Sequence, residues 1–377
     1  MKKIGTITFH ASHNYGSSLQ AYALQEYVKK LCKNNIEYKI INLRTKVQKE
    51  IYTNVFEQKN WKSYIKRLFV IKEKEQLSIK CYNFENFIHN KLDITKEFST
   101  LEELKKQNLG FDYYISGSDQ IWNLTPVDFD WSYYLEFIHN AKKISYSASF
   151  GPIKQNWTSE HKERIKNNLN EYNHISVREL GSLNNIKDLI NKEAKIHIDP
   201  TLLLTEKEWD KIIDKEPILK KDYILFYDLK WKKTSTKIAK VLSKKFKMPV
   251  IITCFTGIKA QYSNFEKHYD CGPLEFLNLI KNAKLVLSSS FHGTVFSIIF
   301  HKHFFAIDGD KDFRINNLLT TLNLQNRTIN IKDLKEKSNQ AFDKINFSLT
   351  EDILNKERNR SKEYLLTALE IKIKEKK

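Results

Sequence analysis

Hydrophobic and polar residues alternate in short blocks at the start of the chain, and the blocks predict a strand, a loop, a helix and a second strand. Residues 4–9 alternate and are rich in β-formers, residues 10–16 are polar, and residues 37–43 alternate again. Ser17 and Gln20 have the spacing of a capping box at the start of the helix. The apolar face of that helix is Leu19, Tyr22, Ala23, Val28 and Leu31. A strand–helix–strand unit of this kind predicts a parallel sheet.

The same alternation recurs along the chain and predicts an α/β fold. In the first half we expect strands at residues 112–116, 142–150, 175–178 and 195–198. In the second half we expect strands at 223–227, 249–254, 285–289 and 303–307, and helices at 233–246, 273–283, 293–300 and 351–376. Asp199-Pro200 interrupts the pattern and marks the domain boundary. The prediction is therefore two Rossmann-like domains, residues 1–200 and 201–377, that face each other across a cleft, the second carrying the terminal helix.

Residues 46–108 form a lysine-rich insert in the first domain, and we expect this insert to be mostly helical. One helical face in it is apolar and consists of Trp61, Ile65, Leu68 and Phe69. Basic residues border that face, namely Lys59, Lys62, Lys66 and Arg67. Such a helix can lie on a membrane surface or pack on its own domain, and the pattern leaves both interpretations open.

The composition is that of a globular protein with a large excess of positive charge. The 377 residues are 41% hydrophobic and 12% aromatic, and the formal net charge is +18. Anionic small substrates, nucleic acid and an anionic membrane face are compatible with this charge, as is a solvated lysine-rich surface. No zinc-finger, RRM or KH signature is present, so we expect no nucleic-acid partner.

The cysteines, the N-terminal segment and the most apolar stretch together indicate where in the cell the protein is expected. The four cysteines include no C-x-x-C pair, which argues against a disulfide framework and against a zinc site. The N-terminal segment lacks the continuous apolar core of a signal peptide. The most apolar stretch, residues 291–307, is interrupted by histidines and a lysine. We therefore expect a cytoplasmic protein.

Three loops at predicted strand ends in the first half carry clusters of polar side chains. Residues 10–18 place a glycine and hydroxyl groups at a helix start, where an anion or a sugar hydroxyl can bind, although a capped turn is the simpler interpretation. Residues 115–123 are rich in hydrogen-bonding groups, and Trp122 could stack on a sugar ring. Arg178 follows an apolar strand and needs an anionic partner, which is either Glu179 or a substrate.

The segment Leu287–Thr294 is the most informative of the candidate loops. His292 and Gly293 enter a predicted helix directly after a strand, so the imidazole is expected beside backbone N–H donors that bind anions. Histidine can transfer a proton near neutral pH, and a structural histidine is the alternative. No G-x-S-x-G elbow is present, so a hydrolase triad is not indicated.

Taken together, these stretches resemble the polysaccharide pyruvyl transferase family. The matching stretches are Asn14–Tyr22, Ser116–Asn123, Ile144–Gly151, Ile175–Glu179, Asp199–Leu203 and Ser290–Ile298. The resemblance implies transfer of a pyruvyl group from phosphoenolpyruvate to a sugar of a cell-surface polysaccharide or its precursor. It also implies a fold similar to that of GT-B glycosyltransferases, with the acceptor on the first domain and the donor on the second.

The resemblance also implies site residues. His292 matches the histidine of the family's Phe/Leu-His-Gly segment, which is associated with phosphoenolpyruvate binding and catalysis, and Arg178 matches the arginine of a Ser-Val-Arg-Glu segment. Many members have an arginine where this chain has Ser290, so Arg314 or a lysine is expected to supply that charge together with Arg178. The expected catalytic residues are His292, as acid–base group, and Asp119, as hydroxyl ligand or base. The expected substrate-binding residues are Arg178, Ser290, Gly293, Arg314, Asn14, Tyr15, Gly16, Ser118, Gln120 and Trp122.

The implied chemistry starts with protonation of C3 of phosphoenolpyruvate, which makes C2 electrophilic. A sugar hydroxyl adds, phosphate leaves, and a neighbouring hydroxyl closes a cyclic ketal. No redox cofactor is needed and no metal site is expected, although metal dependence stays open. The expected partners are phosphoenolpyruvate and a sugar or lipid-linked glycan, with peripheral contact to the anionic inner face of a membrane as a further expectation. The alternatives are a GT-B glycosyltransferase that uses a nucleotide sugar and a non-enzymatic protein that binds anionic surfaces.

Overall fold

The computed structural model describes residues 1–33, 35–52, 73–151, 155–229, 232–254 and 264–371. The chain divides into two compact units. Unit 1 comprises Met1–Ile51, Ile88–Leu204 and Leu354–Lys377, and unit 2 comprises Tyr52–Phe87 and Thr205–Ile353. The basic helical face predicted within residues 59–69 lies outside the described residues.

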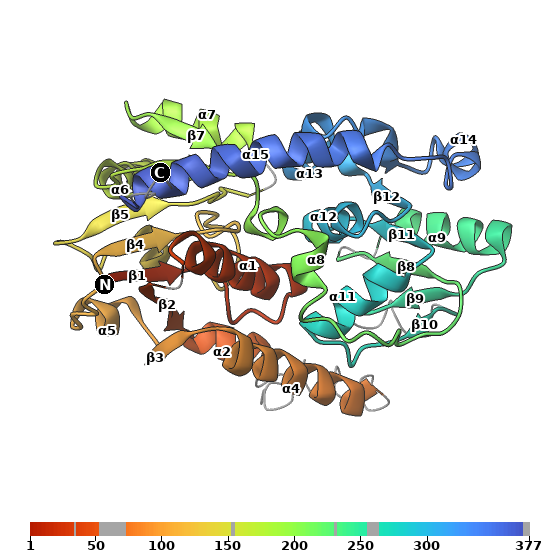
Figure 1. Cartoon of the computed structure of the whole chain (residues 1–377), viewed down its shortest axis with the longest axis horizontal. Coiled ribbons are helices and arrows are strands. Elements are labelled where there is room, and N and C mark those ends of the chain that lie inside the picture. Colours follow the sequence, from red (N-terminus) through yellow and green to blue (C-terminus); the bar gives the residue numbers. More distant parts are fainter. Residues whose placement is uncertain (34, 53–72, 152–154, 230–231, 255–263, 372–377) are drawn as a thin grey trace, which may run out of the picture. The chain divides into compact units, whose positions relative to one another are not determined.

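Unit 1 is built on a five-stranded parallel sheet with the order β3-β2-β1-β4-β5 (Figure 1). Its strands are β1 (Lys2–Ile7), β2 (Ile36–Leu43), β3 (Ile94–Phe98), β4 (Tyr113–Ser116) and β5 (Lys142–Ser145). A two-stranded parallel sheet, β6 (Ile175–Val177) and β7 (Ala194–Ile196), continues beyond β5 through bridges from Ile144 to His174 and from Ala148 to Val177. The helices are α1 (Tyr15–Leu31), α2 (Lys46–Tyr52), α5 (Leu101–Lys105), α6 (Ser159–Asn170) and α7 (Leu180–Leu189).

Unit 2 contains a six-stranded parallel sheet with the order β10-β9-β8-β11-β12-β13. Its strands are β8 (Ile224–Tyr227), β9 (Val250–Ile252), β10 (Glu266–Lys267), β11 (Leu285–Ser288), β12 (Phe304–Ile307) and β13 (Thr328–Ile329). Its helices are α8 (Glu206–Trp209), α9 (Lys233–Phe246), α11 (Pro273–Asn282), α12 (Phe291–Ile299), α13 (Phe313–Thr321) and α14 (Leu334–Asn339). Every residue of β8, β11 and β12 is buried, as expected for central strands covered on both faces.

The helices α4 (Lys74–Lys91) and α15 (Phe347–Ala368) each begin in unit 2 and end in unit 1. The sequence assigned the terminal helix wholly to the second domain, whereas the structure groups the chain from Leu354 onward with unit 1. Hydrogen bonds explain this grouping. Arg358 Nε donates to the carbonyl of Leu202 at 2.8 Å, and the hydroxyl of Tyr364 donates to the carbonyl of Ser145 at 2.7 Å.

The described part of the insert 46–108 contains a strand, β3, besides the helices α2, α4 and α5, and the sequence did not predict this strand. It is an edge strand whose exposed Lys96 and Glu97 hide the alternation around buried Phe98. One further expectation from the sequence is corrected. The strand predicted at 142–150 ends at Ser145, and its last residues form a loop at the carboxyl end of β5.

Each sheet has a topological switch point. In unit 1 the chain leaves β1 toward β2 on one side, and β4 pairs with β1 on the other side. In unit 2, β8 lies in the same way between β9 and β11. Ligands of open α/β sheets bind outside the carboxyl ends of the strands at such points. The α/β prediction is therefore confirmed, and it directs attention to the loops after β1, β4, β8 and β11.

Among the described residues, no helix is long and apolar enough to cross a lipid bilayer.

Candidate functional site

The first predicted loop forms the start of α1 in unit 1. Asn14 is the N-cap, and its side-chain oxygen accepts a hydrogen bond from the backbone N–H of Gly16 at 3.0 Å. Tyr15 and Gly16 are the first helical residues, and both are buried. The predicted capping box of Ser17 and Gln20 is therefore wrong, because the helix has already begun when the chain reaches Ser17.

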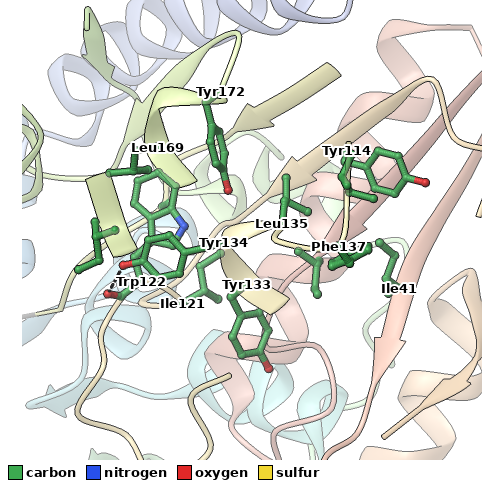
Figure 2. Packing of buried hydrophobic residues seen from close by; sticks show 14 of the residues in the cluster. Ile41, Tyr114, Ile121, Trp122, Tyr133, Tyr134, Leu135, Phe137, Leu169 and Tyr172 are labelled. Carbon is green, nitrogen blue, oxygen red and sulfur yellow. Dashed lines mark hydrogen bonds between the residues drawn. The ribbon is translucent and has the colours of Figure 1, made fainter. Parts of the chain in front are cut away.

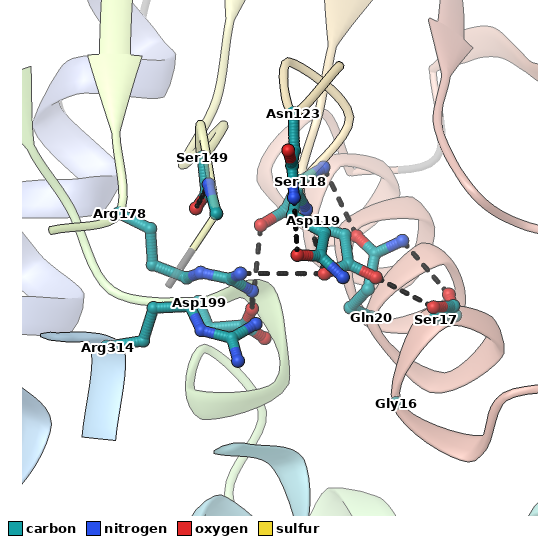
Figure 3. Close-up of polar contacts among 12 residues, drawn as sticks. Gly16, Ser17, Gln20, Ser118, Asp119, Asn123, Ser149, Arg178, Asp199 and Arg314 are labelled. Atoms are coloured by element: carbon teal, nitrogen blue, oxygen red, sulfur yellow. Dashed lines mark hydrogen bonds and ion pairs between the residues drawn. The ribbon is translucent and has the colours of Figure 1, made fainter. Parts of the chain in front are cut away.

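Ser17 and Gln20 instead connect α1 to the loops that follow β1 and β4. The Ser17 hydroxyl donates to Oδ2 of Asp119 at 2.7 Å. Gln20 Nε2 donates to Oγ1 of Thr8 at 2.8 Å, and Gln20 Oε1 accepts from the backbone N–H of Ser118 at 3.2 Å. The two loops beside the switch point are thus fastened to one helix (Figure 3).

The loop after β4 presents the predicted cluster of polar groups. Asp119 has a φ of 75°, in the left-handed region that residues with a side chain rarely adopt, and its Oδ1 accepts from the backbone N–H of Gln120 at 2.8 Å. The Ser118 hydroxyl donates to the carbonyl of Ser147 at 2.7 Å, and Asn123 Nδ2 donates to Oε1 of Gln120 at 3.2 Å. Backbone strain of this kind persists where surrounding contacts hold it, and it is frequent at functional sites.

Trp122 belongs to the hydrophobic core and does not offer a ring face to a sugar. Its side chain is fully buried, and its indole N–H donates to the hydroxyl of Ser116 at 3.0 Å. The ring stacks on Tyr134 with centroids 5.7 Å apart and also contacts Tyr172 (Figure 2). A further ring contact is made with Phe150. This burial contradicts the predicted sugar-stacking role of Trp122.

Arg178 lies at the carboxyl end of β6 among three buried carboxylates. Its Nη1 donates to Oδ2 of Asp199 at 2.8 Å, its Nη2 lies 3.5 Å from Oδ1 of Asp119, and its Nε lies 3.6 Å from Oε2 of Glu179 (Figure 3). Burial lowers the pKa of Arg178, but the negative charges of Asp199, Asp119 and Glu179 outweigh it and raise that pKa above its ordinary value.

This environment argues against the predicted role of Arg178 as an anion clamp. Its side chain is 2% exposed, and a substrate phosphate would have to compete with three carboxylates for one guanidinium. The simple Arg178–Glu179 pair proposed from the sequence is also incomplete, because the shortest contact is to Asp199.

In unit 2 the second cluster forms where β11 leads into α12. Ser290 is the N-cap, and His292 is the second residue of the helix. The imidazole is 6% exposed and packs edge-to-face on Phe291, with ring centroids 5.2 Å apart. His292 thus lies in the same turn as the first backbone N–H groups of α12, just after the carboxyl end of β11, where a helix N-terminus favours negative charge.

Gly293 is required by the close packing of α12 on the sheet. A Cβ atom at this position would lie 2.8 Å from Cδ1 of Tyr227 and would overlap the hydroxyl of Ser288. Gly293 therefore lets the helix start approach β8 and β11, which sets the position of the neighbouring His292.

Arg314, in the first turn of α13, belongs to the same unit as His292. Its Nε and Nη2 donate to the two carboxylate oxygens of Asp312 at 3.0 and 2.7 Å. Burial raises the pKa of Asp312, but the hydrogen bonds and charge of Arg314 outweigh it and lower that pKa. The guanidinium carbon lies 5.9 Å from the ring centroid of Phe291, so a cation is held close to the start of α12.

Polar groups that the sequence did not single out lie at the same edge of the second sheet. The hydroxyl of Ser289 donates to Oδ1 of Asp228, after β8, at 2.5 Å. Asp308, after β12, pairs with Lys232 at 3.2 Å and with Lys311 at 3.0 Å. The strand order is needed to find this cluster, because β8 and β11 pair in the sheet although β9 and β10 lie between them in the sequence.

The predicted site residues therefore form two sets. Unit 1 brings together Asn14, Tyr15, Gly16, Ser118, Asp119, Gln120 and Arg178 around the carboxyl ends of β1, β4 and β6. Unit 2 brings together Ser290, His292, Gly293 and Arg314. Within the described part of the chain, no group of three or more His, Cys, Asp or Glu side chains is arranged to hold a metal ion.

Comparisons with known proteins agree with this architecture. A family model described as polysaccharide pyruvyl transferase matches residues 14–311. A search of curated proteins finds no match to the chain.

Several solved structures have similar folds. The Staphylococcus aureus MnaA–UDP co-structure has a TM-score of 0.55 at 9% identity and covers 93% of this chain and 90% of its own. UDP-N-acetylglucosamine 2-epimerase from Rickettsia bellii has a TM-score of 0.52 at 9% identity and covers 98% of this chain and 97% of its own. These neighbours have GT-B-type folds, so the predicted fold class is confirmed. At such identities the likeness concerns the fold alone.

Proposed function

Because the chain belongs to the polysaccharide pyruvyl transferase family, we propose that it transfers a pyruvyl group from phosphoenolpyruvate to a sugar of a cell-surface polysaccharide or its precursor. The product is a cyclic ketal on two sugar hydroxyls, and the second product is phosphate. The observation that carries the proposal is the position of His292 in the first turn of α12, beside the switch point of the second sheet. An imidazole next to helix N–H groups combines a proton donor with an anion site.

Unit 2 is the proposed donor side. The N–H groups at the start of α12 and the guanidinium of Arg314 bind the phosphate and carboxylate of phosphoenolpyruvate. His292 delivers a proton to C3, which becomes a methyl carbon, and C2 becomes electrophilic. Arg314 supplies the positive charge of the arginine that many family members have at the position of Ser290.

Unit 1 is the proposed acceptor side. Asp119 accepts the proton of the sugar hydroxyl that attacks C2, while Ser118, Gln120 and the start of α1 bind neighbouring hydroxyls. The bond from C2 to the phosphate oxygen then breaks, and the second hydroxyl closes the ketal on C2. Of the two hydroxyl protons, one replaces the proton that was given to C3 and the other leaves with phosphate. The reaction needs no redox cofactor, and its metal dependence can be read from activity with and without a chelator.

The deciding experiment offers phosphoenolpyruvate together with a panel of galactose-, mannose-, glucose- and N-acetylhexosamine-containing acceptors. We expect one phosphate released per pyruvyl group found in the product by mass spectrometry, and no activity in His292→Ala. Protection of the protein against thermal unfolding by phosphoenolpyruvate alone, reduced in Arg314→Gln, tests the donor side without an acceptor. A nucleotide-sugar-dependent product with phosphoenolpyruvate left intact would overturn the proposal.

We also propose that the protein acts in the cytoplasm and contacts the anionic face of a membrane. The net charge of +18 supports this contact, since cationic residues near an anionic leaflet contribute about 1 kcal/mol each. Co-sedimentation with liposomes that contain anionic lipid, weakened by salt, is the expected result. Equal partitioning onto neutral liposomes would contradict it.

A further inference from the structure

Arg178 joins two carboxylates that lie far apart in the sequence. Nη1 donates to Oδ2 of Asp199 at 2.8 Å, and Nη2 lies 3.5 Å from Oδ1 of Asp119. The side chains are 2%, 0% and 7% exposed for Arg178, Asp199 and Asp119, so water does little to screen these charges. The guanidinium is shared between the two carboxylates, and the closer partner is Asp199.

Asp199 is held rigidly. Its Oδ1 accepts from the backbone N–H of Thr201 at 3.0 Å and from the Thr201 hydroxyl at 2.7 Å, because Asp199 caps the short 3-10 helix Pro200–Leu202. The backbones of Arg178 and Asp119 are also held by hydrogen bonds. The backbone N–H of Arg178 donates to the carbonyl of Ala148 at 3.0 Å, and the backbone N–H of Ser149 donates to the carbonyl of Asp119 at 3.0 Å.

The backbone therefore holds both carboxylates in place, and the guanidinium of Arg178 lies closer to Asp199 than to Asp119. The guanidinium therefore stabilises the ionised form of Asp119 less than it would in a pair with Asp119 alone. A carboxylate that is less strongly neutralised by a cation binds a proton more readily. The strength with which Asp119 binds a proton thus depends on Asp199, which shares Arg178 with it.

We propose that Asp199 is a positioning residue that, by holding Arg178, sets how strongly Asp119 binds a proton. The inference rests on the proposed function, in which Asp119 accepts the proton of the acceptor hydroxyl. The charged and titratable groups around this arrangement include Arg178 and Glu179 after β6, Asp199 after β7 and Tyr146 after β5. From α1 the neighbour is the neutral hydroxyl of Ser17.

The sign of the effect follows from the charges. Asp199→Asn removes one negative charge and releases Arg178 toward Asp119, so the pKa of Asp119 falls. A nearby charge shifts a carboxyl pKa by about 1–3 units, and we expect the pKa of Asp119 to fall by about 1 unit. The acidic limb of kcat/KM should move to lower pH by the same amount. The rate on the plateau should fall several-fold, because a weaker base accepts the hydroxyl proton less readily.

Two further variants make the test specific. Glu179→Gln removes the more distant partner of Arg178, at 3.6 Å, and should shift the pKa of Asp119 in the same direction by less. Glu136→Gln is the matched control, because it breaks an Arg–Glu pair of unit 1 in which Arg164 makes two bonds of 2.7 Å. Glu136 lies outside the site, so this variant should leave the pKa of Asp119 and the pH profile unchanged.

The pKa of Asp119 can be measured without turnover. Carboxyl ¹³C NMR of protein labelled at aspartate follows the titration, and the Asp119→Asn variant assigns the signal. A shifted signal in Asp199→Asn without any reaction of phosphoenolpyruvate would support the Asp199 inference while the proposed function fails. Turnover with an unmoved signal and an unmoved acidic limb in folded Asp199→Asn would overturn the Asp199 inference and leave the proposed function intact. If Asp199→Asn does not fold, the smaller shift expected in Glu179→Gln decides.

Discussion

The hydroxyl of Ser17 lies 2.7 Å from Oδ2 of Asp119, although 102 positions separate the two residues in the sequence. The contact joins the first turn of α1 to the loop after β4, on either side of the switch point of the first sheet. A hydrogen bond to a charged carboxylate is stronger than a neutral one and restricts the direction in which the carboxylate points. Ser17 therefore orients the residue that we propose as the base.

Removing this hydroxyl should slow the reaction more than it weakens acceptor binding. A hydrogen bond to a charged group contributes about 1.5–3 kcal/mol, so Ser17→Ala should lower kcat by about tenfold or more with little change in the KM for the acceptor. Ser18→Ala is the control, since the neighbouring hydroxyl only donates to the carbonyl of Ser12 at 3.3 Å. Equal losses of kcat in the two variants would indicate that Ser17 stabilises α1 and does not orient Asp119.

His292→Ala should keep the fold and lose activity. A positioned acid–base group contributes on the order of 10²-fold or more to the rate, and the lost imidazole is a small part of the core. His301→Ala, which changes a more exposed histidine in the same unit, should retain full activity. Steady-state kinetics and circular dichroism on both variants check this expectation, and an active, folded His292→Ala would remove His292 from the mechanism.

Gly293→Ala should damage the start of α12. The added methyl group meets the ring of Tyr227 at 2.8 Å and the hydroxyl of Ser288, and overpacking of this kind costs about 1–3 kcal/mol of the free energy of unfolding. Denaturant unfolding measures the loss. Gly110→Ala is the comparison, because its Cβ would meet no atom within 4 Å and only its φ of 67° would be strained. We expect the Gly110 variant to lose stability without losing activity.

Arg178→Gln should be strongly destabilising at neutral pH. It leaves three buried carboxylates without their guanidinium, and breaking a buried pair costs about 3–5 kcal/mol. The pKa values of these carboxyls in the folded variant should rise, so its stability relative to the parent should recover as the pH falls and be lost as the pH rises. Urea unfolding across pH 5–8 tests the sign. A variant that is fully stable but binds phosphoenolpyruvate weakly would restore the anion-clamp role.

His197 should make the protein sensitive to mild acid. Burial, together with the charges of Arg360 and Lys195, lowers the pKa of His197 from 6.5 to about 4. Because the pKa is lower in the folded state, the contribution of neutral His197 to the free energy of unfolding is fully present above pH 6.5. This contribution is lost as the pH falls toward 4. The loss should be on the order of 2 kcal/mol. In His197→Gln, Tm should depend less steeply on pH within this window, and an unchanged dependence would contradict the assignment.

The sequence predicts the strands of both sheets where local pattern suffices and misses them where it does not. Ile224–Tyr227 and Leu285–Ser288 are continuous apolar runs, because both faces of these strands are covered. β10 and β13 have only two residues each and contain too little pattern to detect. β3 was not predicted, because an edge strand tolerates exposed lysine and glutamate, and these residues obscure the alternating pattern.

The same distinction applies to the candidate site. His292 and Gly293 were predicted because strand, loop and helix start are contiguous in the sequence. Of the three carboxylate partners of Arg178, only Glu179 was predicted, because Asp199 lies 21 positions away and Asp119 lies 59 positions away. Trp122 was misassigned for a related reason. A tryptophan in a polar loop looks exposed until the rings of Tyr134 and Tyr172, supplied by other segments, surround it.

The passage of α15 from unit 2 back into unit 1 has a consequence for biosynthesis. Unit 1 contains both the first and the last residues of the chain, with Thr205–Ile353 of unit 2 in between. Domains usually fold in the order in which the ribosome makes them. Here the unit that is begun first is completed only after Thr205–Ile353 of unit 2 have been made, because its contacts from Arg358 and Tyr364 to Leu202 and Ser145 come from residues that follow them. A premature stop codon between Ile353 and Arg358 would therefore remove these contacts from the amino-terminal unit while leaving every described strand of the second sheet translated.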